Sequence, residues 1–523
     1  MARRSSPSPV TVTSLSEVTG YGHGVTVPRR RAVCALLTGL LCLPLAACTE
    51  SSGLTGGDGP EPAPAASPTQ SDELQAPESL DAARSQPVAD PVYPGRGEPY
   101  LDTLHYHLDL DWDVTTTTLN GTATITFGVT ETRERITFDL DESLEVTIAV
   151  LDGTEVETRR AGDTLTVTTG QELSPLAEHS LAVSYEGVPE PTDFPGSRTD
   201  IPGLGWTTMA DGSVWTMQEP FGAFTWYPVN DQPGDKAYYD ATITSNGGFT
   251  NVFNGAVVET ETDGDTTTTS WHLEEPAASY LVTIAIGDYE AVADEGPDGL
   301  SMTYWLEPES AAPLKYLEEA PDMLVYLEDL LGPYPFQTAG LVVVPAASAM
   351  ETQETTTIGD SLFLADDVRV RGVLLNEYAH QWLGNTVTPD NWHDLWLNEG
   401  LTMYVQLMWE DSVGLSDFDV TIGEWSARDQ ADRVAYGPPG GFRPDEFASI
   451  NVYHSGAVML HHIREVVGDD AFFETLRAWP QQNVNASVDR DDFVEFWSEG
   501  TGTELGPFVD AWLTSRMTPT SGP

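Results

Sequence analysis

Residues 376–380 carry polar side chains at a spacing that could bind a metal ion and move a proton. They read Asn-Glu-Tyr-Ala-His, and in a helix positions 376 and 380 lie one turn apart on the same face, with Glu377 at its flank. In the arrangement H-E-x-x-H, two His at this spacing bind zinc and the Glu acts as the general base. Here Asn376 occupies the first of the two His positions, and only His380 supplies an imidazole.

Two predicted helices would position this chemistry. Asp366 and Asp367 suit the positive N-terminal end of the first helix, and Gly384-Asn385 can close it. Glu399, which follows His380 by 19 positions, opens a second helix that runs to about residue 410. A carboxylate from a second helix is a suitable further ligand for zinc.

The residues after His380 form two further motifs. Residues 380–389 read His-Gln-Trp-Leu-Gly-Asn-Thr-Val-Thr-Pro, and residues 392–400 read Trp-His-Asp-Leu-Trp-Leu-Asn-Glu-Gly. These motifs resemble those of the aminopeptidase N family of zinc metallopeptidases, the gluzincin aminopeptidases. The resemblance implies a zinc cofactor, with His380 and Glu399 as metal ligands, Asn376 in place of the other His ligand, and Glu377 as the catalytic base.

The same resemblance implies two substrate-binding carboxylates and a catalytic tyrosine. Glu351, in the segment Ala-Met-Glu-Thr-Gln at 349–353, matches the Glu that binds the free amine of the substrate. Glu219, nine positions before Pro228, matches a second amine-binding residue. Tyr453, just before His-Ser-Gly-Ala, matches the tyrosine that acts on the transition state in members of this family. Two carboxylates facing an ammonium group would select peptides with a free N-terminus.

Replacement of an imidazole by an amide weakens the expected zinc site. An amide oxygen is a poorer zinc donor than imidazole, so the metal is expected to be weakly bound, absent or a different ion. His393 is the nearest candidate substitute, but the family pattern places that position on an outward loop. Three functions therefore stay open: a metal-dependent aminopeptidase, an inactive relative that binds peptide N-termini or a surface partner, and a structural lipoprotein.

The rest of the folded chain divides into a strand-rich part and a mainly helical part. Residues 104–114 alternate apolar and polar side chains, which predicts a strand with one buried face; His105 and His107 share the other, solvated face. Similar Thr-rich runs continue to about residue 293. Near residue 314 the pattern becomes helical, with a helix predicted at 320–331 and a buried strand at 340–345. The fold class is therefore multidomain α+β, with a β-sandwich-like domain at 96–300.

The resemblance implies a thermolysin-like, mainly helical catalytic domain at 301–523. It extends from about residue 98 to Leu513. Because the chain ends soon afterwards, we expect it to lack the C-terminal helical domain of larger family members and to have a more open cleft.

The N-terminus indicates export and lipid anchoring. Residues 29–31 are all Arg, residues 32–47 are largely apolar, and Leu-Ala-Ala-Cys ends at Cys48. This pattern predicts a signal peptide at 1–47, and Leu-Ala-Ala-Cys resembles a bacterial lipobox whose Cys48 is lipidated. The alternative is an ordinary cleaved signal. Residues 48–95, rich in Pro, Gly, Ser and acidic side chains, are predicted to be a flexible tether.

Composition limits the partners and the metal ligands. With 82 acidic and 23 basic residues the formal net charge is −59, which disfavours nucleic acid as a partner. The three cysteines all lie in the first 48 residues, so a metal site in the folded part must use His, Asp, Glu or neutral oxygen donors. The expected partners are peptides with a free N-terminus and, through the lipid, the outer face of the cell membrane.

Overall fold

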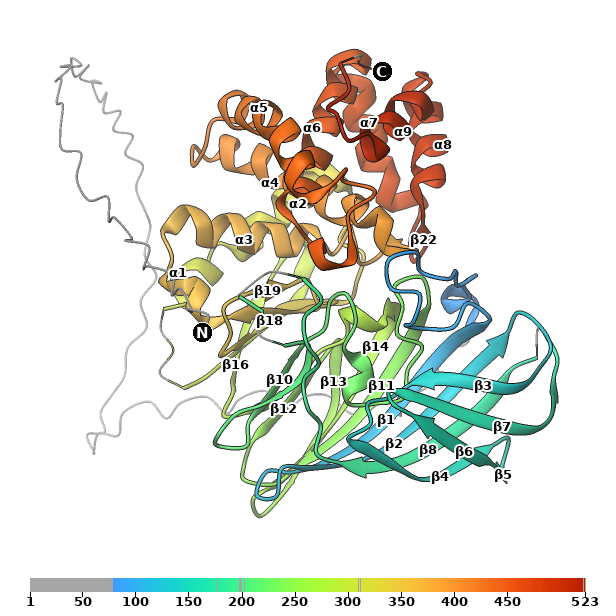
Figure 1. Ribbon diagram of the computed structural model, residues 1–523. Coiled ribbons are helices and arrows are strands. Elements are labelled where there is room, and N and C mark those ends of the chain that lie inside the picture. The colour runs from blue at the N-terminus through green and yellow to red at the C-terminus, as the bar shows by residue number, and fades with distance from the viewer. Residues whose placement is uncertain are drawn as a thin grey trace, which may run out of the picture. The chain divides into compact units, whose positions relative to one another are not determined.

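The computed structural model describes residues 79–520 and 522, except residues 176, 197–199, 202, 309 and 311, and they fall in a compact unit that spans Thr69–Pro523 (Figure 1). The predicted signal peptide, Cys48 and the first part of the predicted tether lie outside the described residues. No helix within the described ranges combines the length and the apolar character that a bilayer span requires.

The first part of the described chain consists of strands, as the sequence predicted. In one sheet the strands follow the order β13 (Ala256–Asp263), β14 (Thr266–Ala278), β11 (Lys236–Ser245), β1 (Leu101–Asp113), β2 (Thr118–Val129), β8 (His179–Gly187), β4 (Leu144–Leu151) and β5 (Thr154–Glu155). A second sheet contains β12 (Thr250–Phe253), β15 (Ile284–Gly287), β10 (Val214–Met217) and β9 (Gly205–Thr208). A third contains β3 (Arg133–Asp139), β7 (Thr164–Leu173) and β6 (Glu157–Ala161).

Strand β1 follows the predicted alternation. Leu104, Tyr106 and Leu108 are buried, whereas His105 and His107 are partly exposed. β1 pairs antiparallel with β2 and parallel with β11. Tyr106 and Leu108 belong to the main core, whereas Leu104 packs with Ala83 and Tyr238 in a separate small cluster. His105 does not face solvent alone, because its Nε2 lies 2.9 Å from a carboxylate oxygen of Asp240 on β11.

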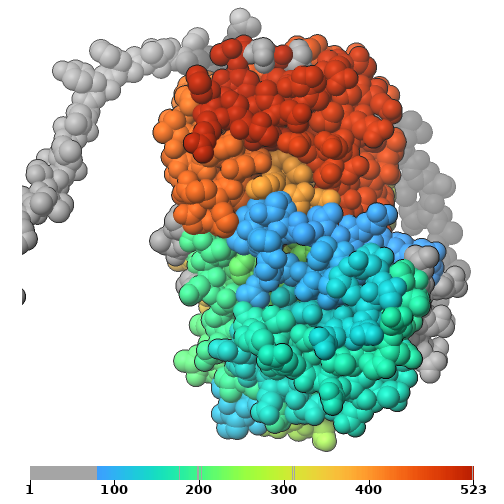
Figure 2. Space-filling view, turned by 45° about the vertical axis from the view of Figure 1, so that its right-hand side comes forward, coloured from blue at the N-terminus to red at the C-terminus, as the bar shows by residue number. Residues whose placement is uncertain are grey.

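Residues 79–95, the last part of the predicted tether, are folded against the rest of the unit. Val92 and Tyr93 are buried, and Asp90 accepts a hydrogen bond from the backbone N–H of Trp392 at 2.8 Å. The Tyr93 hydroxyl donates to the carbonyl oxygen of Pro444 at 2.9 Å. In Figure 2 this blue segment lies between the red helical part and the teal strands. The folded region therefore begins earlier than composition indicated.

The second part combines a small mixed sheet with helices, which confirms the predicted fold class. The sheet order is β16 (Glu290–Glu295), β17 (Ser301–Leu306), β18 (Thr338–Val344), β20 (Thr355–Gly359) and β19 (Ala349–Met350). β16 and β17 are antiparallel partners, so the predicted boundary at 300/301 falls within this sheet. β21 (Thr388–Pro389) pairs with β22 (Ser487–Val488).

The helices gather in the C-terminal half of the chain (Figure 1). Their bounds are α1 (Leu314–Leu317), α2 (Ala320–Leu331), α3 (Asp367–Ala379), α4 (Leu395–Ser412), α5 (Phe418–Tyr436), α6 (Ile450–Val467), α7 (Asp469–Gln482), α8 (Arg490–Thr501) and α9 (Gly506–Thr514). Asp366 caps α3, because its carboxylate accepts from the backbone N–H of Arg369 at 3.1 Å. α4 begins at Leu395, one turn before the predicted start at Glu399.

A buried lysine joins the strand-rich part to the loop after α3. Lys236, on β11, donates through Nζ to the carbonyl oxygens of Asn385 at 2.7 Å and Thr386 at 2.9 Å. Burial lowers the pKa of Lys236 to about 7, because the ammonium group loses hydration and the charge of Glu275 offsets this loss only in part. The contact fixes the segment that follows His380 against the large sheet.

Candidate active site

A cavity of about 650 Å³ lies between the strand-rich part and the helices α3, α4 and α6. Each of the residues to which the sequence assigned a metal-binding, catalytic or substrate-binding role lines this cavity: Glu219, Glu351, Asn376, Glu377, His380, Glu399 and Tyr453. These side chains come from a loop after β10, the end of β19, α3, α4 and α6. The fold therefore brings the whole predicted set together, while the role of each residue stays a prediction.

His380 is held in one orientation at the C-terminal end of α3. Its Nδ1 lies 3.1 Å from the carbonyl oxygen of Leu383 and 3.1 Å from Oγ1 of Thr402. A carbonyl oxygen can only accept, so the ring proton lies on Nδ1 and, in the neutral ring, Nε2 keeps its lone pair. Nε2 faces Asn376, whose Oδ1 is 3.1 Å away.

Glu399 brings a carboxylate to the same point from α4. Its Oε2 lies 3.5 Å from Nε2 of His380, and both side chains are almost fully buried. The next residue, Gly400, touches Gly456 of α6; a Cβ on Gly400 would lie only 2.8 Å from the Cα of Gly456. Glycine at both positions lets α4 and α6 approach closely, which places Glu399 and Tyr453 on the same cavity.

The distances between the three donor atoms fit a small divalent ion. The donor set, however, has one imidazole where the H-E-x-x-H arrangement has two. Ligands about 2.0–2.1 Å from a tetrahedral ion lie about 3.3 Å from one another, close to the 3.1 and 3.5 Å observed. In the Nδ1-protonated ring, lone pairs of Asn376, His380 and Glu399 converge, and a cation between them would offset their repulsion. Among the described residues no group of three His, Cys, Asp or Glu side chains is arranged to hold a metal, because the third donor is an amide oxygen.

The predicted base and the predicted tyrosine share the cavity with this donor group. Glu377, next to Asn376 on α3, is buried, with a relative exposure of 7%. Tyr453 is partly exposed near the start of α6. Both line the cavity, to which they bring a carboxylate that can accept a proton and a hydroxyl that can donate a hydrogen bond.

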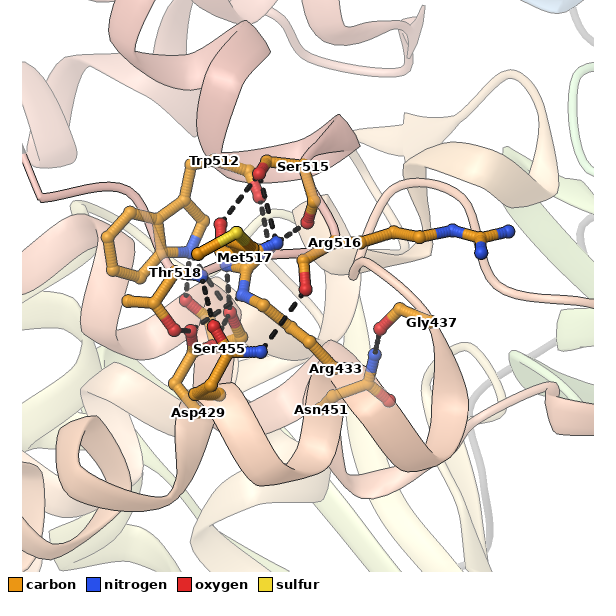
Figure 3. Close-up of polar contacts among 11 residues, drawn as sticks. Asp429, Arg433, Gly437, Asn451, Ser455, Trp512, Ser515, Arg516, Met517 and Thr518 are labelled. Carbon is orange, nitrogen blue, oxygen red and sulfur yellow. Dashed lines mark hydrogen bonds and ion pairs between the residues drawn. The ribbon is translucent and has the colours of Figure 1, made fainter.

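A buried polar cluster contacts α6 through Ser455 (Figure 3). Arg433 of α5 pairs with Asp429 at 2.6 Å and donates to Oγ of Ser455 at 3.0 Å and to the carbonyl oxygen of Trp512 at 2.7 Å. The side chains of Arg433 and Asp429 are 0% and 1% exposed. Because Ser455 lies two positions after Tyr453, the cluster positions the helix that carries the tyrosine.

Acidic side chains form one end of the cavity. Glu351 accepts a hydrogen bond from Nδ2 of Asn398 at 2.9 Å, and its backbone carbonyl accepts from Nδ2 of Asn385 at 2.7 Å. Burial raises the pKa of the nearby Tyr280 well above its usual value, and the charges of Glu351, Glu219 and Glu399 raise it further. These carboxylates therefore create a negative field around one end of the cleft, which suits a positively charged ligand.

Sequence reasoning missed several residues that shape the site. Thr402 orients His380, Asn398 orients Glu351, and Arg369 lines the cavity. Asn398 directly precedes Glu399 in a motif that the sequence highlighted, and Thr402 follows one turn later on α4, so helical spacing could have indicated both. His393 does not line the cavity; its ring lies 6.2 Å from that of Phe442.

The fold and this site define the class of metallopeptidases in which a strand-rich domain precedes a helical catalytic domain. Sequence comparison identifies the family within that class. Residues 102–281 match the Peptidase M1 N-terminal domain, and residues 316–512 match the Peptidase family M1 domain. The chain belongs to peptidase family M1.

Its relatives are aminopeptidases of greater length. Aminopeptidase B of Rattus norvegicus is 29% identical over 306 residues, which cover 55% of this chain and 46% of that protein. Aminopeptidase N of Haemonchus contortus is 26% identical over 337 residues, 59% of this chain and 34% of that protein. The chain thus spans less than half the length of these two relatives.

Solved structures of M1 zinc metallopeptidases match most of the chain. The enzyme of Deinococcus radiodurans superposes with a TM-score of 0.72–0.73 in wild-type and mutant forms at 26% identity, covering 84% of this chain and 100% of that one. A mutant of that protein bound to the substrate Tyr-Ser-Ala superposes with a TM-score of 0.71 at 26% identity and the same coverage. The match extends over both the strand-rich and the helical parts.

Proposed function

We propose that this protein is an extracytoplasmic, metal-dependent aminopeptidase that removes N-terminal residues from peptides. The observation that carries the proposal is the convergence, in one cavity, of a His and a Glu that can bind a metal, a buried carboxylate beside them, and separate carboxylates at one end. Membership of the M1 family and the aminopeptidase relatives support the same reading.

The two acidic residues at the end of the cavity would bind the free amine of the substrate. Glu351 is held by Asn398, and Glu219 lines the same end. An ammonium group between two carboxylates forms charge-assisted hydrogen bonds, whereas an acylated N-terminus has no charge there. This arrangement would place the first peptide bond beside His380 and Glu377.

The chain's own residues would then perform the proton transfers. Zinc, held by His380, Glu399 and the amide oxygen of Asn376, would act as a Lewis acid and lower the pKa of water to about 7. A carboxylate oxygen of Glu377 would accept the proton of the attacking water and pass it to the nitrogen of the leaving amine. The hydroxyl of Tyr453 would donate a hydrogen bond to the oxygen of the former carbonyl.

We further propose that Asn376 weakens zinc binding. The amide supplies a neutral oxygen where the family pattern has an imidazole nitrogen, and its Nδ2 is buried without a hydrogen-bond partner in the described structure. The same substitution favours a second candidate function, a catalytically inactive relative that binds peptide N-termini. Both candidates use the acidic end of the cavity, and they differ only in whether bound peptide is cleaved.

Metal content and peptide turnover of the purified full chain distinguish the two functions. An aminopeptidase should contain about one metal per chain at saturating zinc, cleave leucine p-nitroanilide and lose activity with a chelator. Glu377→Gln should reduce turnover by about 100-fold or more with unchanged folding and unchanged metal content. Peptide binding with no turnover at any zinc concentration would support the inactive relative instead, and full activity of Glu377→Gln would refute the assigned base.

We also propose that the protein is exported and anchored by a lipid on Cys48. The support is the basic and apolar pattern of residues 29–47 followed by the lipobox-like Leu-Ala-Ala-Cys. Two or more acyl chains hold a protein stably at a membrane surface. In a bacterial host, Cys48→Ala should abolish palmitate labelling and release the protein from the membrane fraction, whereas unchanged fractionation would refute the anchor.

A further inference from the structure

The cavity is lined by several carboxylates and by one basic side chain. Besides the predicted metal ligand and base, Asp200, Glu219, Glu351 and Glu446 line it, and Arg369 is the only lysine or arginine among the described residues that do. Arg369 lies near the start of α3, and the loop after α3 contacts Glu351 through Asn385. The helix therefore runs along the cleft from the arginine toward the amine-binding end.

The helical geometry sets the distance from the arginine to the reacting bond. Arg369, Val373 and Asn376 follow one another at helical spacing and all line the cavity. With a rise of 1.5 Å per residue, the Cα of Arg369 lies about 10 Å along the axis from that of Asn376. An extended peptide advances about 3.3–3.5 Å per residue, so this distance corresponds to two or three residues beyond the scissile bond.

The guanidinium group of Arg369 is available for a ligand. Its backbone N–H serves the cap of α3 through Asp366, but its side chain is exposed and makes no ion pair or hydrogen bond with any described residue. Arg371, two positions later on the same helix, pairs with Glu319 at 2.6 Å.

We propose that Arg369 binds a substrate carboxylate on the leaving side of the scissile bond, so that the cavity prefers peptides of three or four residues with a free C-terminus. This inference rests on the proposed aminopeptidase function. A short peptide carries an ammonium group at one end and a carboxylate at the other, matching the carboxylates and the arginine of the cavity. The planar guanidinium can hold a carboxylate through two parallel hydrogen bonds.

The carboxylate could belong to the C-terminus or to an acidic side chain at the third residue. Both present the same chemistry to Arg369, and synthetic peptides separate them. Leu-Ala-Ala and Leu-Ala-Ala-Ala with free C-termini test the first source. Their C-terminal amides remove that charge, and the amide of Leu-Ala-Asp restores a carboxylate only on the third side chain.

Turnover of these peptides by the full chain at saturating zinc tests the preference. The parent should cleave the free acids with a kcat/KM about five- to tenfold higher than the amides, as one partly exposed, charge-assisted contact provides. Arg369→Gln should abolish this ratio by lowering the kcat/KM for the free acids to that for the amides. Arg371→Gln, which removes the same charge from the same helix, should retain the ratio. An equal loss on acids and amides in Arg369→Gln, or an equal effect of both variants, would overturn the proposal.

Measurements of peptide binding distinguish an error in the proposed carboxylate site from an error in the proposed aminopeptidase function. In a Glu377→Gln background, calorimetry with the same peptides should show the five- to tenfold preference for the free acid, and its loss in Arg369→Gln. If the parent cleaves none of the peptides but binding shows the preference, the aminopeptidase function fails and the carboxylate site stands. If peptides are cleaved with no preference in either assay, the carboxylate site is refuted and the function stands.

Discussion

Asn376→His should convert a weak zinc site into a strong one. The donor atoms of Asn376 and Glu399 lie 3.1 and 3.5 Å from His380 Nε2. An imidazole at position 376 would therefore complete a His-His-Glu set, with the two His one turn apart at the end of α3 and the Glu on α4. Changes in groups that only orient the metal ligands alter metal affinity by about 10–100-fold. We therefore expect this change in a ligand itself to increase zinc affinity by about 100-fold or more.

The gain can be measured as stability, independently of activity. At a free zinc concentration that half-saturates the parent, binding stabilises the parent by about 0.4 kcal/mol, and a site that is 100-fold tighter by about 2.7 kcal/mol. Urea denaturation at buffered free zinc should therefore show the variant gaining about 2.3 kcal/mol more than the parent. In the absence of added zinc, a chelator should change the free energy of unfolding of the parent and of Asn376→His equally.

Two further variants control this experiment. Asn376→Ala removes the amide without adding an imidazole and should bind zinc no better than the parent. Asn376→His combined with Glu399→Gln should lose most of the gain, because it removes the charged ligand. A folded Asn376→His protein whose zinc affinity equals that of the parent would show that these three side chains do not share one ion, and would refute the site geometry.

Three other perturbations test the packing around the site. Arg433→Met should lower the free energy of unfolding by about 3–5 kcal/mol, because it leaves the buried carboxylate of Asp429 without its partner; in urea denaturation, adding Asp429→Leu should recover much of the loss, and no recovery would contradict this cause. His272→Gln should destabilise more at pH 5.5 than at pH 9, on the order of 1 kcal/mol. Its hydrogen bond to Asp240 raises the pKa of His272, so the stabilisation is complete below the unfolded pKa and disappears as pH rises through the folded one; an equal cost at both pH values would exclude the pair. Burial lowers the pKa of Lys236 to about 7, so between about pH 7 and 10 the unfolded state binds the extra proton and the parent should gain roughly 1 kcal/mol per pH unit relative to Lys236→Met. Parallel stability curves from pH 7 to 9 would refute that account.

Local sequence patterns were sufficient for the fold class and for individual elements. The alternation in β1 and the helical period of α2 predicted both elements, since each depends on which face of a short segment is buried. Element ends were less accurate. α4 begins at Leu395, a turn before the predicted start, because Trp396 and Leu397 are buried by packing that no local signal encodes.

Distant contacts explain the error in the predicted tether. Composition alone made residues 79–95 look flexible, because they are rich in small and polar side chains. In the structure Asp90 and Tyr93 contact Trp392 and Pro444, about 300 and 350 positions later in the chain. Contacts over such separations form only when the rest of the chain has folded, so the composition of the segment alone could not predict them.

The sequence was sufficient to predict which residues line the cavity, but not the contacts that surround them. Spacing within one helix identified Asn376, Glu377 and His380, and motif resemblance added the residues on other elements. The orientation of His380 by Thr402, and the lack of an ion pair between Arg369 and any residue that the structure describes, follow from which helices pack together. Residue type and helical period are local properties that a sequence records directly, while distances, burial and charge pairing arise only when segments far apart in the chain are brought into contact.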